Sequence, residues 1–461
     1  MKTWRDRSLL LLAAVLHGLV YMLLLPSWMG EDEPWHVEYA HHISTGHTPW
    51  GGIEMHGADR EENDDRRLMP LSQLQVRRRI GQIDPLEIRE TQEEIISSMR
   101  EESFFRRVDF APWHGGATNF DQIQDAFTAT HQPPLYYALA ALVTNLSGAE
   151  TPLEELRSMR WIGFACYLAM IAITLALARL VTKDLIIVTL AGFFCAWIPM
   201  HARQAAVVNN DVLAKAIGGA LLLAGAYQLS RVKGRLSLTS VLTLLALIIL
   251  AFATKTTTLA CVICAGFAYV AAPARGDGGK TLLAALACGG ILAVGYAYWR
   301  YTHSPSLPTN WEDVSERLEK GISSTNMEEL WRTSVGTFNW YSRDLAGGVS
   351  STLLVVLLFL VLGSFWRLYR PNGNDQILLL LCFVAVGSQL AMIILRGVSA
   401  GRYLSPVIPA VAVLMAVGAK AVGPKFTRRR IVSGLVIGLI AFDAVFLWRG
   451  LLVNQYLVWG D

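Results

Sequence analysis

Long apolar runs alternate with short polar turns along most of the chain. The runs are 17 to 24 residues long and carry few charges, so each is long enough to cross the roughly 30 Å hydrocarbon core of a bilayer. The pattern therefore predicts an all-α polytopic membrane protein with about eleven membrane-spanning helices. The predicted spans cover residues 8–26, 158–181, 184–200, 211–230, 237–253, 256–272, 281–302, 351–369, 375–395, 403–421 and 430–448.

Two further segments have helical patterns but do not fit a span. The apolar core of residues 133–148 is nearer 15 residues, which is short for a span, so we predict an interfacial or re-entrant helix. Residues 84–107 form an amphipathic pattern with Asp84 as N-cap, Pro85 at the first helical position and a basic pair at the end. We therefore expect juxtamembrane helices besides the spans.

Composition agrees with a membrane protein. The 461 residues are 53 % hydrophobic and 17 % charged, whereas soluble domains contain about 25 % charged residues. The first run follows basic residues but ends without a small-x-small cleavage site, so we expect an uncleaved signal anchor. All six cysteines lie in apolar runs, which predicts packing residues and no disulfide framework.

The basic residues fix the expected orientation. With the N-terminus inside, the cytoplasmic turns are basic, as the positive-inside rule requires. Loop 31–130 contains 20 acidic residues and 10 Arg, a net charge of −10, although the whole chain carries +3. We expect a multi-pass protein with its N-terminus in the cytoplasm and loop 31–130 on the outer face. The predicted organisation is a first span (1–30), a large outer loop (31–157), spans 2 to 7 (158–302), a second outer loop (303–350), and spans 8 to 11 with a short outer tail (351–461).

In this topology, the outer ends of several helices carry ionisable residues. Charges at the lip of a membrane are costly to desolvate, so each is a functional candidate. A carboxylate there can act as general base towards a hydroxyl, and nearby cations can hold the phosphate of an amphiphile. The candidates are Glu31, Asp32, Glu33, His131, His201, Arg203, Asp211, Lys255, Arg396 and Arg402.

Each candidate also has a structural interpretation. Asp32 and Glu33 precede Pro34 and suit a helix cap. Asp211 is one turn from Lys215 and suits a packing ion pair. The four histidines at 36, 41, 42 and 47 lack the i,i+4 spacing of a helical zinc site, so we do not expect a metal there.

Five segments resemble, in order, those of GT-C glycosyltransferases, a superfamily that includes protein O-mannosyltransferases and the lipid A aminoarabinose transferase. EDEPWHVEYAHHISTGHTP resembles their first outer loop, and THQPPLYYALAALV is similar to the element that starts the last juxtamembrane helix. IPMHARQAAVVNNDVLAKAIG resembles the loop with the second acidic residue. ATKTTTL and GRYLSPVIPA resemble a Lys-containing turn and a helix start. The chain is thus identified as a bacterial GT-C member of undefined substrate.

The resemblance implies roles for individual residues. Asp32 is the expected base for the acceptor hydroxyl or amine, with Glu33 beside it to orient the substrate or tune the charge, and Asp211 as the second acid lining the cavity. His36 lies on the acceptor side. The donor is a polyprenyl-phosphate-linked sugar, transferred with inversion to a cell-envelope glycan, lipid or protein. No cofactor and no tightly bound metal are expected, and nucleic acid is not a partner. The residues expected to hold the donor phosphate are His131, Arg203, Lys255 and Arg402.

Three alternatives stay open at this stage. A glycan ligase or polymerase also attacks a lipid-linked donor but prefers a pyrophosphate, and a catalytically inactive GT-C scaffold would only bind lipids. A transporter is expected to show ionisable residues or broken helices near the midplane, often in repeated halves, whereas here the charges gather at one lip and no halves repeat. The long acidic outer loop and the lack of a sizeable domain after the last span depart from several GT-C members, which leaves the acceptor undetermined.

Overall fold

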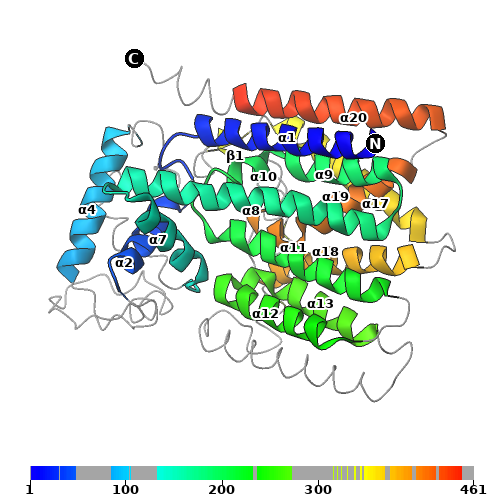
Figure 1. Ribbon diagram of the computed structural model, residues 1–461. Helices are drawn as coiled ribbons and strands as arrows, with labels where there is room; N and C mark the ends of the chain where they lie inside the picture. Colours follow the sequence, from blue (N-terminus) through cyan, green and yellow to red (C-terminus); the bar gives the residue numbers. More distant parts are fainter. Residues whose placement is uncertain are drawn as a thin grey trace.

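A bundle of long helices with smaller helices at one end makes up the protein (Figure 1). The computed structural model describes residues 2–30, 32–47, 85–102, 104, 132–231, 236–272, 347–368, 374–396, 401–421 and 425–448, with a few residues between 315 and 344. Ten of the predicted spans coincide with helices, and the predicted span 281–302 lies outside the described residues. The bundle helices are α1 (Lys2–Leu24), α8 (Pro152–Val181), α9 (Leu185–Trp197), α11 (Asn210–Ser230), α12 (Leu238–Thr254), α13 (Leu259–Ala271), α17 (Gly347–Leu368), α18 (Asn374–Arg396), α19 (Ile408–Ala421) and α20 (Lys425–Val445).

Four of the described helices are both long enough and apolar enough to cross a membrane by themselves. They correspond to α8, α11, most of α18, and α19 together with the turn before it, and the other apolar helical stretches whose side chains are described are 10–17 residues long. Within the 18-residue apolar stretch of each helix, 67 % of the residues are buried inside the protein in α11 and 78 % in α19. The corresponding shares are 44 % in α8 and 39 % in α18. The two buried helices therefore form the centre of the bundle.

Shorter elements surround the end of the bundle where the candidate residues lie. They are α2 (Glu33–Ser44), α4 (Pro85–Glu101), α7 (Leu135–Ser147), α10 (Pro199–Gln204) and the 3-10 helices η2 (Thr256–Thr258) and η5 (Gly401–Val407). The helices α2, α4 and α7 lie together beyond one end of the bundle, and α8 extends from the bundle to reach them (Figure 1). Strand β1 (Thr337–Phe338) pairs antiparallel with β2 (Arg343–Asp344). The predicted class, an all-α polytopic membrane protein, is confirmed apart from this short pair.

Local capping explains where the helices start. The hydroxyl of Thr151 and the carboxylate of Glu154 form a capping box, with Pro152 at the first helical position. Because this box begins a polar first turn, α8 starts six residues before the predicted span 158–181. Similarly, the side chain of Asn209 accepts from the amide of Asp211 at 2.8 Å and starts α11. Helix α7 ends at Gly148, which has φ 64°, the left-handed conformation that glycine adopts readily.

Small residues let the central helices approach closely. A side chain at Gly418 of α19 would collide with the carbonyl oxygen of Leu360 in α17. The Cβ position of Gly218 in α11 lies 2.8 Å from Cβ of Pro406 in η5. Close backbone contact at small residues is typical of helix packing in membranes. The five described cysteines, Cys166, Cys195, Cys261, Cys264 and Cys382, are free, as expected for packing residues.

Candidate active site

The first ion pair of the site joins the start of α2 to the start of η5. Asp32 stands at the N-cap of α2 in the left-handed conformation, with φ 61° and ψ 11°, and its side chain makes no capping hydrogen bond. Instead, Arg402 at the start of η5 donates from Nη1 to Oδ2 of Asp32 at 2.9 Å. The capping interpretation of Asp32 is therefore not supported, since the carboxylate faces a cation 370 positions away in the sequence.

The second ion pair joins the start of α11 to the turn after α12. Lys255 has an extended backbone with φ −168°, and its Nζ lies 2.7 Å from Oδ1 of Asp211. The same ammonium donates to Oδ1 of Asn210 at 2.9 Å. The partner found for Asp211 is thus a residue of another element, although the sequence also offered Lys215, one turn along the same helix.

The two ion pairs belong to one site. Both cations lie near the ring of Tyr403, with Cζ of Arg402 at 5.6 Å and Nζ of Lys255 at 5.8 Å from the ring centroid. The charges of both pairs also act on the nearby imidazole of His36. Four charged residues therefore converge at one end of the bundle, although they come from the N-caps of α2 and η2, from the first turn of α11 and from η5.

His36 provides a neutral imidazole beside these charges. It lies one turn after Asp32 in α2, and its Nδ1 is 2.7 Å from the hydroxyl of Tyr137 in α7. Burial lowers the pKa of His36 to about 3, and the charges of Asp32, Lys255, Asp211 and Arg402 act on it in opposing directions. The ring is therefore uncharged at neutral pH.

Asp32 is the accessible member of the four. Its side chain is 40 % exposed, whereas the side chain of Arg402 is 15 % exposed, that of Lys255 11 % and that of Asp211 2 %. Removal from bulk water by itself raises the pKa of Asp32, but the charge of Arg402, helped by His36 and Lys255, outweighs this and holds the pKa below its ordinary value of 3.8. At neutral pH this carboxylate is ionised and open to an incoming molecule.

Glu33 and Arg203 are placed differently from the four converging residues. Glu33 is fully buried, and its carboxylate accepts from the guanidinium of Arg160 in α8. Arg203 in α10 is buried as well and donates from Nη2 to the carbonyl oxygen of Met29 at 3.3 Å. Their predicted contacts to substrate stay predictions, and His131 lies outside the described residues.

The sequence pattern did not predict that Arg160 pairs with Glu33. Arg160 falls in the first turn of the predicted span 158–181, where a basic residue suits an interfacial anchor, and its partner Glu33 is 127 positions away. The one usable signal was an arginine at the outer end of a span, which requires a partner when it is buried.

The described residues do not offer a metal centre. No group of three His, Cys, Asp or Glu side chains within the described segments is arranged to hold an ion. The carboxylates of Asp32 and Asp211 each already face a cation at 2.7–2.9 Å. Among the histidines of α2, His41 pairs with Glu155 at 2.9 Å and His36 with Tyr137. This donor set does not fit a tightly bound divalent cation.

Comparison with known proteins identifies the fold. The family model described as "Predicted membrane protein (DUF2142)" matches residues 15–411. The structure of the archaeal oligosaccharyltransferase AglB from Archaeoglobus fulgidus, in complex with an inhibitory peptide and a dolichol-phosphate, is similar with a TM-score of 0.50 and 13 % sequence identity, over 99 % of this chain and 56 % of that one. This likeness shows that the chain has the GT-C fold.

A second structure of the Archaeoglobus fulgidus oligosaccharyltransferase, tethered with an acceptor peptide containing the NVT sequon, has a TM-score of 0.47 and 14 % identity, over 99 % of this chain and 55 % of that one. The chain thus spans little more than half the length of these solved relatives. No curated protein matches the sequence.

Proposed function

The chain belongs to the DUF2142 family of predicted membrane proteins, and from its GT-C fold and its converging charges we propose that it is a membrane glycosyltransferase. It moves a sugar from a polyprenyl-monophosphate donor to a hydroxyl or amine of a cell-envelope acceptor. The reaction takes place on the outer face of a bacterial inner membrane. The observation that carries the proposal is the ionised, accessible Asp32 next to the cations Arg402 and Lys255.

Asp32 acts as the general base. The acceptor oxygen or nitrogen approaches the anomeric carbon while its proton passes to the carboxylate of Asp32. A new bond to the anomeric carbon forms as the bond between that carbon and the phosphate oxygen breaks. Because Asp211 is buried beside Lys255 and is not placed as a nucleophile, the reaction is a single displacement that inverts the anomeric centre.

Arg402 and Lys255 stabilise the leaving group. The donor is a phosphodiester with one negative charge, and it becomes a phosphate monoester that gains a second charge as the glycosidic bond breaks. Cations held in a fixed geometry near that oxygen favour the transition state over the ground state. Arginine also offers the forked donors that match phosphate oxygens. On donor binding, the phosphate competes with Asp32 for Arg402, and this exchange frees the carboxylate for the acceptor.

Charge balance favours a monophosphate over a pyrophosphate donor. The two carboxylates and two cations of the site sum to zero, and a phosphodiester adds only one negative charge. A lipid pyrophosphate adds a second negative charge and so requires a further cation, whereas the charge of the buried Lys215 already acts on Asp211. A ligase or polymerase that uses a pyrophosphate donor is therefore the second candidate, and a lipid or solute transporter without chemistry is the third.

The proposal is tested with labelled donors in sealed membrane vesicles. Polyprenyl monophosphates and pyrophosphates that carry one radiolabelled sugar each are supplied singly, and label leaving the donor pool is measured. We expect release or transfer with one monophosphate donor. Turnover of pyrophosphates alone would contradict the donor assignment, and binding of lipid without any turnover would contradict the assignment as an enzyme.

A further inference from the structure

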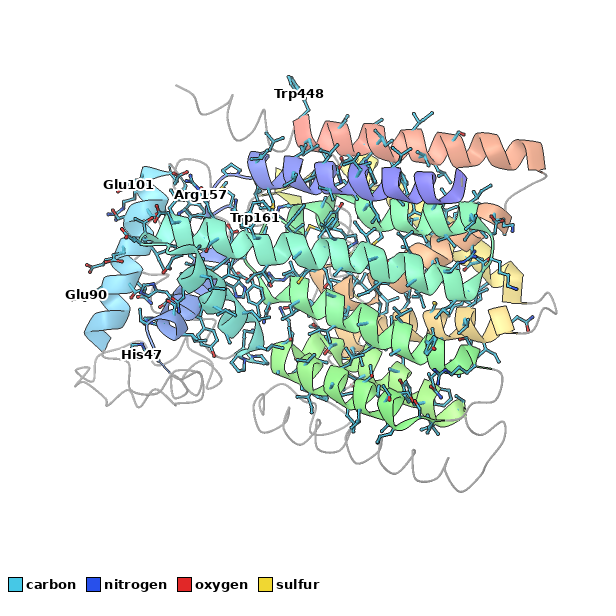
Figure 2. All side chains as sticks on the ribbon, viewed as in Figure 1. His47, Glu90, Glu101, Arg157, Trp161 and Trp448 are labelled. Atoms are coloured by element: carbon cyan, nitrogen blue, oxygen red, sulfur yellow. The ribbon has the colours of Figure 1, made fainter. Side chains whose placement is uncertain are left out.

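Arg160 of α8 is a buried cation whose guanidinium donates four hydrogen bonds. It lies on α8 between Arg157 and Trp161, where the helix leaves the bundle towards α2 (Figure 2). Its Nε donates to Oε1 of Glu33 at 3.0 Å and its Nη2 to Oε2 at 2.8 Å. Nη1 donates to the carbonyl oxygen of Leu25 and Nη2 to that of Pro26, both at 2.9 Å. One buried guanidinium thus holds the turn that leads from α1 to α2.

The carboxylate of Glu33 joins this turn to a third segment. Oε2 accepts from the amide of Gly30 at 2.9 Å, within the turn itself. Oε1 accepts from the backbone amide of Val208 at 2.9 Å. Val208 lies in the segment between α10 and α11. With both oxygens accepting two donors each, no part of this fully buried carboxylate is left for a substrate.

The segments that meet at Glu33 are the ones that carry the two acids of the site. Asp32 is the preceding residue, and its left-handed backbone, like that of Trp28 with φ 66° in the same turn, is unfavourable for a non-glycine residue. Such a conformation persists only where its surroundings hold it. Val208 lies three residues before Asp211, whose backbone amide donates to the side chain of Asn209.

Close packing reinforces the same junction. The Cβ position of Gly163, nearly one turn after Arg160 in α8, lies 2.7 Å from the carbonyl oxygen of Ala205. A side chain at Gly30 would collide with Val207 and with Glu33. The turn, the segment 205–209 and α8 therefore have little freedom to move relative to one another.

We propose that Glu33 and Arg160 form a clasp that positions the catalytic site. The clasp fixes the distance between the Asp32–Arg402 half and the Asp211–Lys255 half, and it holds Asp32 in its left-handed conformation. Both residues act through Asp32 and Asp211 and do not touch the substrate. The inference rests on the proposed function for its kinetic test, and it replaces the predicted role of Glu33 in orienting the substrate.

The alternative is that this buried ion pair serves only the stability of the fold. The two roles separate in a double variant, Glu33→Gln with Arg160→Gln, which removes both charges and the guanidinium fork together but keeps amide groups that can bond the backbone of the turn. Either single substitution would leave an unpaired buried charge and unfold the site for trivial reasons. Arg160→Lys serves as the conservative variant, because it keeps the positive charge but loses the paired N–H donors of the guanidinium.

A matched control exists between the same two helices. His41 of α2 pairs with Glu155 of α8 at 2.9 Å, five residues before Arg160 and away from the converging charges. The control variant is His41→Leu with Glu155→Leu. It removes an ion pair between α2 and α8 without touching the turn or segment 205–209.

The first readout is hydrogen exchange, which needs no substrate. In the clasp variant, we expect the amides of peptides covering 26–33 and 205–209 to exchange at least tenfold faster than in the wild type. The control variant should exchange there at the wild-type rate. Unchanged exchange in the clasp variant would overturn the clasp, whatever the activity of the protein.

The second readout is transfer. A misplacement of about 1 Å lowers the rate of a positioned reaction by about 100-fold, so we expect kcat of the folded clasp variant to fall about that much, with a smaller change in KM. The kcat of Arg160→Lys should lie between those of the clasp variant and the wild type, and the control variant should keep the wild-type kcat. Full kcat in the clasp variant would overturn the positioning role. If the wild type transfers no sugar, the proposed function fails, and the exchange measurement alone decides on the clasp.

Discussion

At the scale of single residues, the site is a set of compensated charges with one accessible carboxylate. Asp32 and Arg402 neutralise each other, as do Asp211 and Lys255. Compensation allows four charges to lie together at the end of an apolar bundle, because an unpaired charge there would be costly. The exposure of Asp32 is the reason that we propose it, rather than the buried Asp211, as the base.

We propose two roles for Arg402, which are to bind the donor phosphate and to lower the pKa of Asp32. Substitutions of Arg402 report on both. Arg402→Ala should raise KM for the donor about 10- to 100-fold, since a hydrogen bond to a charged group contributes about 1.5–3 kcal/mol. Because Arg402 lowers the pKa of Asp32, its loss should raise that pKa and move the acid limb of the pH–rate profile to higher pH. Arg402→Lys, which keeps the charge, should show a smaller shift. Kinetics over a pH series check both effects, and equal loss of donor and acceptor affinity without a shifted limb would indicate a structural role.

The individual site residues were predictable to different degrees. Asp32, Asp211, Lys255 and Arg402 were expected to meet because each ends a helix on the same face, and the structure brings them together. Glu33 and Arg203 carry the same kind of charge in the same places, but their side chains are buried against Arg160 and Met29. Side-chain direction at a turn depends on φ and on distant partners, which a single sequence does not reveal.

At the scale of elements, the contact between α4 and α2 is sensitive to pH. Glu38 of α2 is buried, and Oε1 accepts from Gln92 of α4 at 2.7 Å. Burial raises the pKa of Glu38 from 4.5 to about 7. Between these values the folded protein keeps a proton that the unfolded chain has lost, so this group contributes stability at low pH that is lost as the pH rises towards 7.

Glu38→Gln mimics the protonated acid at every pH. Relative to the wild type, we expect the variant to gain stability as the pH rises from 4.5 to 7, by at most about 3 kcal/mol, since one pKa unit corresponds to about 1.4 kcal/mol. The relevant quantity is the difference in unfolding free energy between the variant and the wild type. Burial lowers the pKa of His42 to about 3, so His42 makes both proteins more stable as the pH rises, and this contribution cancels in the difference. Thermal unfolding at several pH values measures it, and a constant difference across the series would contradict the prediction.

The crossing of α17 and α19 depends on a glycine. Gly418→Ala would place Cβ against the carbonyl oxygen of Leu360, so we expect the helices to separate and the protein to lose about 1–3 kcal/mol or more. Gly438→Ala in α20 is the matched control, since nothing lies within 4 Å of its Cβ position. The midpoint of thermal unfolding in detergent compares them. An unchanged midpoint for Gly418→Ala would show that the crossing is not tight.

The elements were the part of the fold best predicted from sequence. Ten predicted spans are helices because apolar runs of that length carry an unambiguous signal. Their ends shifted wherever a cap decided the boundary, as at Thr151, or where a 3-10 turn replaced the first helical turn, as at Thr256 and Gly401. The packing of α2, α4 and α7 beyond one end of the bundle depends on contacts between distant segments, which periodicity does not encode.

At the scale of the whole molecule, one end of the bundle carries the site. Trp161 of α8 and Trp448, just after α20, are exposed and both lie towards that end (Figure 2), where aromatic residues mark a membrane–water interface. The opposite end of α8 carries Lys183, which is exposed. The charge pattern and the aromatic residues favour an orientation with α2 and α7 on the outer face.

Labelling of the two ends of α8 tests this orientation. In sealed right-side-out vesicles, a membrane-impermeant maleimide should react with Glu150→Cys and leave Lys183→Cys unmodified until the vesicles are opened. The five described native cysteines are buried or half-buried and give little background. Reaction at Lys183→Cys but not at Glu150→Cys in intact vesicles would reverse the proposed topology.

The proposed glycosyl transfer depends on Asp32 as its general base. The most direct measurement is the turnover of the labelled polyprenyl-phosphate donor in vesicles that contain the wild type or Asp32→Asn, with Asp184→Asn as control. Asp184 is also a half-buried carboxylate paired with a cation, Lys420 at 2.6 Å, at the opposite end of α8. We predict that Asp32→Asn folds and inserts normally and loses transfer by at least about 100-fold, the lower range of general-base contributions, while Asp184→Asn retains it. Undiminished transfer by Asp32→Asn would contradict the account.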